Sequence, residues 1–222
     1  LGPDGSIYIG ENCRIHRVTP DGIIDLFAGG VWSTTGGGDG GPAVGAGMSG
    51  GSYSIRVGPD GSVYVAEGCR IRRVGTDGVI QTIAGGPAGI GYGNPGVNGD
   101  GGPATEALLE DGGLKLTLSP DGSIYIVEWW FQRIRRIDPY GIINTVAGIG
   151  AQGYGGDGGL ATQAQFNDPN DVDAGPDGSI YIADRSNHRI RRLTRALPGY
   201  GSNDILIASE DASELYVFSP RG

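Results

Sequence analysis

Three aspartates recur in the same glycine-rich setting along the chain. They belong to the segments GDGGPAVGA, GDGGPATEA and GDGGLATQA, and they are Asp39, Asp100 and Asp157. Carboxylate and backbone oxygens suit a hard cation, so calcium is the one cofactor that this pattern suggests. The alternative is that each aspartate accepts hydrogen bonds from nearby backbone N–H groups and holds its own turn. We favour this structural role and expect no other cofactor.

Arginines are concentrated in one recurring segment, which reads CRIHRV, CRIRRV, QRIRRI and HRIRRL in its four copies. Such a cluster could bind an anion, but a carboxylate precedes each copy at the end of the segment before it; these carboxylates are Glu11, Glu67, Glu128 and Asp184. Partly buried arginine and carboxylate groups pair well when they are bidentate. We therefore predict structural ion pairs across a hairpin, with Arg135 and Arg191 on one strand and Glu128 and Asp184 on the other.

The third copy differs from the others by three aromatic residues in a row, Trp129, Trp130 and Phe131. Clustered aromatics in a turn are hard to bury all at once, and aromatic residues dominate binding hot spots. They indicate either a hydrophobic contact site for a partner or packing against the neighbouring repeat. The first two copies have Cys13 and Cys69 in this turn, and we expect free or buried thiols because matching positions in adjacent repeats usually lie too far apart for a disulfide.

Residues for enzyme chemistry are few. The chain has two histidines, His16 in one arginine-rich segment and His188 in the turn of another repeat. No Ser-His-Asp, Cys-His or histidine-rich metal set can be assembled from these positions. The sequence therefore favours a non-catalytic protein.

The elements that must position these residues form a repeat. The stretch PDGSIYIADRSNHRIRRL, residues 176–193, has earlier copies that start at Pro3, Pro59 and Pro120. Pro-Asp-Gly is a tight-turn signal, and the β-branched runs on either side of the second turn predict a hairpin. With the flanking segments each repeat gives four short strands, which for the third copy are 114–118, 123–128, 133–137 and 141–147. The copies start 56, 61 and 56 residues apart. A repeat of this length with several strands predicts an all-β propeller of four-stranded antiparallel blades.

Composition excludes some classes of partner. The 222 residues contain 45 Gly and 13 Pro and have a formal net charge of −9. Nucleic acids and anionic membranes bind basic faces, so neither is an expected partner. No apolar run reaches the length of a membrane span, so we expect no insertion. The chain opens in mid-repeat at Leu1, and we expect it to be a fragment whose first blade lacks its inner strand.

Four motifs in fixed order, PDGSIYIAD, NHRIRR, a Gly-Ile-Ile strand and the GDGGPAT link, resemble the NHL-repeat β-propellers of teneurins and bacterial YD-repeat (Rhs-like) proteins. This resemblance implies a secreted or cell-surface protein whose propeller is non-catalytic and typically six-bladed; three complete repeats and a partial first one are visible here. It implies binding to protein or carbohydrate and bracing of an adjoining YD-repeat shell in the same polypeptide. The alternative is a propeller enzyme of the lyase or lactonase type, with a metal over the central channel.

The C-terminal segment departs from the repeat. DILIA, residues 204–208, stands where the fourth repeat should have its outer strand, and a last strand is expected at 214–218. We therefore assign residues 1–208 to the blades. Residues 209–222 are either a closing strand or the start of a following YD-shell domain, and we favour the second because this segment is similar to the passage into such a shell.

Overall fold

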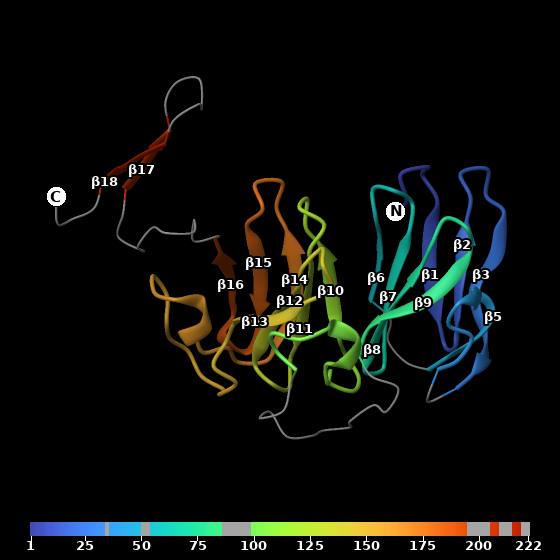
Figure 1. Ribbon diagram of the computed structural model, residues 1–222. Coiled ribbons are helices and arrows are strands. Elements are labelled where there is room, and N and C mark those ends of the chain that lie inside the picture. The colour runs from blue at the N-terminus through green and yellow to red at the C-terminus, as the bar shows by residue number, and fades with distance from the viewer. Residues whose placement is uncertain (34–35, 50–53, 86–98, 195–204, 209–214, 219–222) are drawn as a thin grey trace.

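The computed structural model describes residues 1–33, 36–49, 54–85, 99–194, 205–208 and 215–218. Four β-sheets stand side by side in the order of the sequence, from the blue first blade to the orange fourth (Figure 1). The described part of the chain contains no α-helix, only three short 3₁₀ turns: η1 (Ala104–Glu106), η2 (Ala161–Gln163) and η3 (Arg185–Asn187). The prediction of an all-β fold with four-stranded antiparallel blades is confirmed. A parent ring of six blades stays a prediction.

Blade 3 shows how the repeat folds. Its strands are β10 (Lys115–Leu118), β11 (Ile124–Glu128), β12 (Arg133–Ile137) and β13 (Ile143–Ala147), each antiparallel to the next. The Pro-Asp-Gly turn before β11 closes because Asp121 Oδ1 accepts the backbone N–H of Ser123 and because Gly122 adopts a φ of +82°. Only glycine takes that conformation without steric cost, so this motif marks the start of each hairpin.

The other blades keep this frame with changes at their edges. Blade 2 comprises β6 (Ser54–Val57), β7 (Val63–Glu67), β8 (Arg70–Val74) and β9 (Val79–Ala84), with β4 (Gly41–Pro42) added beyond β9. Blade 1 has β1 (Ile7–Glu11), β2 (Arg14–Val18) and β3 (Ile24–Trp32), and β5 (Val44–Met48) runs parallel to β3. Blade 4 has β14 (Pro169–Ala174), β15 (Ile180–Asp184) and β16 (Arg189–Leu193).

The C-terminal strands do not continue blade 4. Strand β17 (Ile205–Ala208) pairs with β18 (Leu215–Phe218) in a separate two-stranded sheet. The expectation that 204–208 supplies the outer strand of blade 4 is therefore wrong, because β17 lies in the sheet with β18 and not in the sheet of blade 4. The alternatives for 209–222, a closing strand or a following domain, stay predictions, and residues 209–214 and 219–222 lie outside the described part.

Each glycine-rich link bonds to the blades on both sides of it. The second link connects β9 of blade 2 to β10 of blade 3. Its residue Ala104 accepts, through its carbonyl, the backbone N–H of Gly85 at the end of blade 2. On the other side, Gly101 donates to Ile143 and Ala104 donates to Gly141, both in blade 3. The link thus holds the outer strands of two neighbouring blades together.

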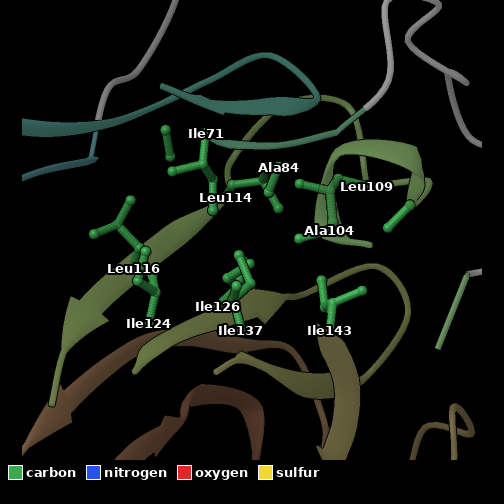
Figure 2. Close-up of a cluster of buried hydrophobic side chains, with 12 residues drawn as sticks. Ile71, Ala84, Ala104, Leu109, Leu114, Leu116, Ile124, Ile126, Ile137 and Ile143 are labelled. Carbon is green, nitrogen blue, oxygen red and sulfur yellow. The ribbon is translucent and has the colours of Figure 1, made fainter. Parts of the chain in front are cut away.

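The core lies between blades rather than inside one sheet. Figure 2 shows side chains from blade 2 (Ile71, Ala84), from the second link (Ala104, Leu109) and from blade 3 (Leu116, Ile124, Ile126, Ile137, Ile143) facing one another. Two further clusters of the same kind lie between blades 1 and 2 and between blades 3 and 4. Val57 packs half-buried against the cluster between blades 1 and 2, whereas Ile124, Ile126 and Ile182 are buried members of the other two clusters. The fold is therefore stabilised by contacts between neighbouring blades, as in other repeat proteins.

Candidate functional site

A buried arginine of blade 3 fastens the second link. The side chain of Arg135, on β12, has no exposed surface. Its Nε and Nη2 donate to Oδ1 of Asp100 at 3.0 and 2.6 Å, and its Nη1 donates to the carbonyl of Leu108 at 3.0 Å. The link therefore wraps a buried guanidinium from two sides, and we call this arrangement the clamp.

The clamp recurs in the neighbouring blades. In blade 2, Arg72 donates through Nε and Nη2 to Oδ1 of Asp39, and in blade 4, Arg191 donates in the same way to Oδ1 of Asp157. In sequence the aspartate precedes its arginine by 33, 35 and 34 residues in blades 2, 3 and 4. This nearly constant spacing can be read from the sequence. The prediction above did not use it, because it paired the arginines with the carboxylates at the strand ends.

The carboxylates at the strand ends complete each clamp. Glu67, Glu128 and Asp184 have fully buried side chains. They lie at 3.3, 3.9 and 3.5 Å from the nearest nitrogen of the clamp arginine in blades 2, 3 and 4. Each also accepts a backbone N–H from the end of the link, donated by Ser49, Glu110 and Asn167 respectively. The structure thus brings the predicted pairs Arg135–Glu128 and Arg191–Asp184 together, but the link aspartate is the closer partner of each arginine.

The link aspartates are occupied by protein groups. Burial raises the pKa of Asp100, but hydrogen bonds from Thr145 and the charge of Arg135 outweigh burial and hold this pKa below its usual range. A hydrogen bond from Tyr154 and another from Arg191 lower the pKa of Asp157. Within the described residues, no group of three or more His, Cys, Asp or Glu side chains could hold a metal ion. The structural role expected for Asp39, Asp100 and Asp157 stays a prediction, with calcium binding as its alternative.

The aromatic turn, residues 129–131, joins β11 to β12 and presents one ring to solvent. The side chain of Trp130 is 52% exposed. Trp129 is half-buried, donates from Nε1 to the carbonyl of Gly112 at 3.1 Å, and meets Trp130 edge to face with ring centroids 5.4 Å apart. The guanidinium of Arg133 lies 5.0 Å from the centroid of the half-buried Phe131 ring. Trp129 and Phe131 therefore pack against the protein while Trp130 faces outward, and a contact site for a partner at this turn stays a prediction.

A buried acid that was not predicted from the sequence lies below this turn. Glu110, at the end of the second link, is 3% exposed, and its Oε2 accepts the backbone N–H of Trp130 at 2.9 Å. Its Oε1 is buried without a hydrogen-bond partner. Burial raises the pKa of Glu110 to about 8; the N–H of Trp130 opposes this rise, and the charge of Glu128 adds to it. No motif in the sequence marks Glu110, because its role depends on the way the link returns under the turn.

The remaining predicted residues lie apart from one another. Cys13 and Cys69 are free and half-buried, each in the turn of its own hairpin. His16, on β2, stands where blades 2, 3 and 4 have their clamp arginine, and His188 adopts a left-handed conformation with φ of 55° in the turn before β16. The helices of the described residues are all too short to cross a membrane.

Comparisons with known proteins agree with this architecture. The NHL repeat family matches residues 166–193, which include the hairpin of blade 4. Teneurin-3 of Danio rerio is 27% identical over 237 residues, covering 99% of this chain and 9% of the relative, and Teneurin-3 of Mus musculus is 30% identical over 177 residues, covering 73% and 6%. The chain thus spans less than a tenth of the length of these relatives.

Solved structures add information on the fold alone. A structural genomics protein of Bacteroides thetaiotaomicron is 20% identical with a TM-score of 0.62 over 86% of this chain and 45% of its own. A streptogramin B lyase is 14% identical with a TM-score of 0.51 over 98% and 67%. The likeness to the lyase says nothing about activity at this identity, since one fold hosts many functions. With the repeated hairpins, the blade sheets and the NHL and teneurin matches together, the chain is a teneurin-like NHL-repeat β-propeller segment.

Proposed function

We propose that this chain is a non-catalytic extracellular interaction module that binds a protein partner through the aromatic turn, residues 129–131. The observation that carries the proposal is the exposed ring of Trp130 on a fixed backbone. An aromatic side chain that is rigid before binding loses little conformational entropy on binding, and tryptophan is enriched among hot-spot residues. Similarity to teneurins supports the extracellular, protein-binding role. We further propose that the module braces an adjoining YD-repeat shell in the same polypeptide.

Three contacts fix the turn from below. Glu110 accepts the N–H of Trp130, the indole of Trp129 donates to Gly112, and Arg133 lies over Phe131 while its Nε donates to Glu128 at 2.6 Å. The corresponding turn of blade 2 is two residues shorter and contains no aromatic residue. The aromatic turn is therefore a feature that blade 3 has in addition to the shared frame, which is where a specific binding surface is expected.

The test is a binding screen on immobilised extracellular protein domains and a glycan array. Trp130→Ala and the matched control Tyr140→Ala, which removes an exposed aromatic side chain from another turn of blade 3, are screened beside the parent chain. We expect a protein ligand whose binding weakens at least about tenfold in Trp130→Ala and is unchanged in Tyr140→Ala. Equal binding by all three chains would contradict the proposal. Binding confined to glycans and lost in Trp130→Ala would replace a protein by a carbohydrate partner.

The enzymatic alternative makes a different prediction. A lyase or lactonase of this fold, with its site over the central channel, would need a bound metal and residues to hold it. Metal analysis of the purified chain separates the two hypotheses: a stoichiometric metal would favour the enzyme, and we expect none.

A further inference from the structure

The returning strand of each hairpin begins with an arginine opposite the strand-end carboxylate; in blades 2, 3 and 4 these arginines are Arg70, Arg133 and Arg189. In blade 3 the guanidinium carbon of Arg133 lies 5.0 Å from the centroid of the Phe131 ring. In blade 4 that of Arg189 lies 4.0 Å from the centroid of the Tyr154 ring. Both distances are within reach of cation–π attraction, so each of these two arginines is paired with an aromatic ring of the chain itself.

Tyr154 contacts both charged groups of this place in blade 4. Its hydroxyl donates to Oδ2 of Asp157 at 2.9 Å and accepts from Nη1 of Arg189 at 2.5 Å. Its ring lies over the guanidinium, whose planar shape suits such stacking. Blade 4 therefore shows how a tyrosine side chain fits between a link aspartate and the first arginine of the strand.

The first link has a glycine where the third link has Tyr154. Gly36 and Tyr154 each lie three residues before the clamp aspartate, and the carbonyl of the next residue, Gly37 or Gly155, accepts Nη2 of the clamp arginine. The guanidinium of Arg70 lies so close to Gly36 that a Cβ there would be 2.1 Å from its Nη1. The first link therefore has no room at this position for the ring that the third link supplies.

A pocket lies beside Arg70. It has a volume of about 410 Å³ and is lined by Arg70, by residues 36–39 of the first link, by Thr82 and Gly85 of blade 2 and by Thr105 of the second link. Ligand sites commonly have volumes of about 300 to 1,000 Å³. Arg70 is only 6% exposed, so its charge is fixed in the wall of the pocket. The lining thus repeats the residues that surround Tyr154 in blade 4 and adds space beside them.

The charges around the pocket favour a neutral ligand with a hydroxyl. Arg70 pairs with Glu67 at 3.4 Å and Arg72 pairs with Asp39 at 2.5 Å, so both arginine charges are offset by carboxylates. A carboxylate or phosphate ligand would meet the negative charge of Asp39 in the same pocket. A phenol hydroxyl can instead donate to this carboxylate, as Tyr154 donates to its counterpart in blade 4.

We propose that this pocket receives the side chain of an exposed tyrosine on a partner protein, with its ring over the guanidinium of Arg70 and its hydroxyl donating to Asp39. A second molecule then makes the contacts that Tyr154 makes within blade 4. The pocket is a separate site from the aromatic turn, residues 129–131, and does not depend on the role proposed for that turn.

Nuclear magnetic resonance of the ¹⁵N-labelled 222-residue chain tests this proposal with N-acetyltyrosinamide as the probe. We expect a saturable shift of the Arg70 Nε–H signal, caused by the ring current of the bound phenol, with a Kd in the millimolar range. N-acetylphenylalaninamide, which lacks the hydroxyl, should bind about fivefold more weakly. N-acetylleucinamide, which has no ring, should leave the signal unchanged, and an equal response to it would overturn the proposal. A response to sodium acetate in place of the tyrosine probe would identify an anion site and would also overturn it.

Two matched variants locate the bound probe. Thr105→Trp fills the pocket from its exposed rim and should weaken binding at least about tenfold. Thr162→Trp makes the same change at the matching exposed position of the third link, and this control should bind like the parent. Thr105→Leu takes the place of the first variant if that variant does not show the parent's circular dichroism spectrum.

Trp130→Ala separates this site from the aromatic turn, because it should bind the probe as the parent does. Loss of probe binding in Trp130→Ala would place the probe at the turn and overturn the proposal. An Arg70 signal that does not respond in the parent chain, or a Thr105→Trp chain that binds like the parent, overturns it as well.

Discussion

In blade 2 the turn between β7 and β8 is Gly68-Cys69, whereas in blade 3 the corresponding turn runs from Trp129 to Gln132. The strands on either side keep the same register, with Glu67 opposite Arg70 and Glu128 opposite Arg133. Two extra residues are thus accommodated in the turn without disturbing the hairpin. Variation between the two blades is therefore concentrated where it changes the surface and leaves the fold unchanged.

The links under these turns differ in the same way. Ser49 and Glu110 occupy matching positions, and each donates its backbone N–H to the strand-end carboxylate above. Only Glu110 has a side chain long enough to reach the turn, where it accepts the N–H of Trp130. The larger turn of blade 3 is thus supported at the cost of a second buried acid beside Glu128. The frame common to both blades and the support specific to blade 3 can be tested separately.

The largest expected effect concerns the shared frame. Arg135→Ala should lower the free energy of unfolding by about 3 kcal/mol, because it leaves the carboxylate of Asp100 without its guanidinium and leaves the buried Glu128 with Arg133 alone. Arg72→Ala should have a similar effect in blade 2. Urea unfolding followed by circular dichroism measures both.

Arg136→Ala is the matched control on the same strand. Its guanidinium pairs with Asp121 at 3.3 Å, and both side chains are about a third exposed. Exposed pairs of this kind contribute about 0.5 kcal/mol. If Arg135→Ala and Arg136→Ala lowered the free energy of unfolding equally, the clamp would contribute no more to stability than an exposed ion pair.

The next effect belongs to blade 3 alone. With a pKa of about 8 in the folded protein against 4.5 in the unfolded chain, Glu110 retains its proton on folding, so stability falls as the pH rises through this window and levels off above it. Glu110→Gln keeps an oxygen for the N–H of Trp130 and cannot ionise. At pH 8.5 we expect this variant to be more stable than the parent by about 2 kcal/mol.

The comparison of the two chains between pH 6 and 9 isolates this group, since other titrating residues are common to both. The difference in stability should grow with pH up to about 8. A constant difference across the range would indicate that Glu110 is ionised in the folded protein throughout.

Local sequence signals were sufficient to predict the blades. The Pro-Asp-Gly turns and β-branched runs placed β10 to β13 within two residues of their observed bounds, because period-two patterns and turn residues act within one hairpin. The prediction for residues 204–208 failed for a physical reason. Strand β17 has the same local strand propensity whether it pairs with β16 or with β18, and propensity does not select the partner.

The candidate site was only partly predictable. The residue types identified the aromatic turn, residues 129–131. Which of its rings is exposed depends on the position of the link residues Glu110 and Gly112, which contact the turn. Likewise Arg135 was recognised as structural, and its main partner Asp100 was missed because the contact joins residues 35 positions apart. Contacts between a link and a blade are set by the path of the chain rather than by local pattern.

A smaller effect distinguishes the two tryptophans of the turn. Trp129→Ala should lower stability by about 1.5 kcal/mol, because it removes a half-buried ring and the hydrogen bond to Gly112. Trp130→Ala should change stability by less than about 0.5 kcal/mol, since its ring is 52% exposed. Thermal unfolding measures both. A larger loss in Trp130→Ala would mean that the exposed ring supports the fold and is not reserved for a partner.

The smallest expected effect is that of calcium on the clamps of blades 2, 3 and 4. If Asp100 or Asp157 bound the ion, added calcium would raise the melting temperature by mass action in a saturable way, and a chelator would reverse the rise. We expect no such rise, because Oδ1 of each aspartate already accepts two arginine N–H groups and a cation would have to displace a guanidinium from a buried, hydrogen-bonded position. Magnesium chloride at equal ionic strength is the control for screening. A saturable rise in melting temperature that is specific to calcium and lost in the double variant Asp100→Asn, Asp157→Asn would show that the links hold a metal. The clamp would then be the metal-free form of a calcium site.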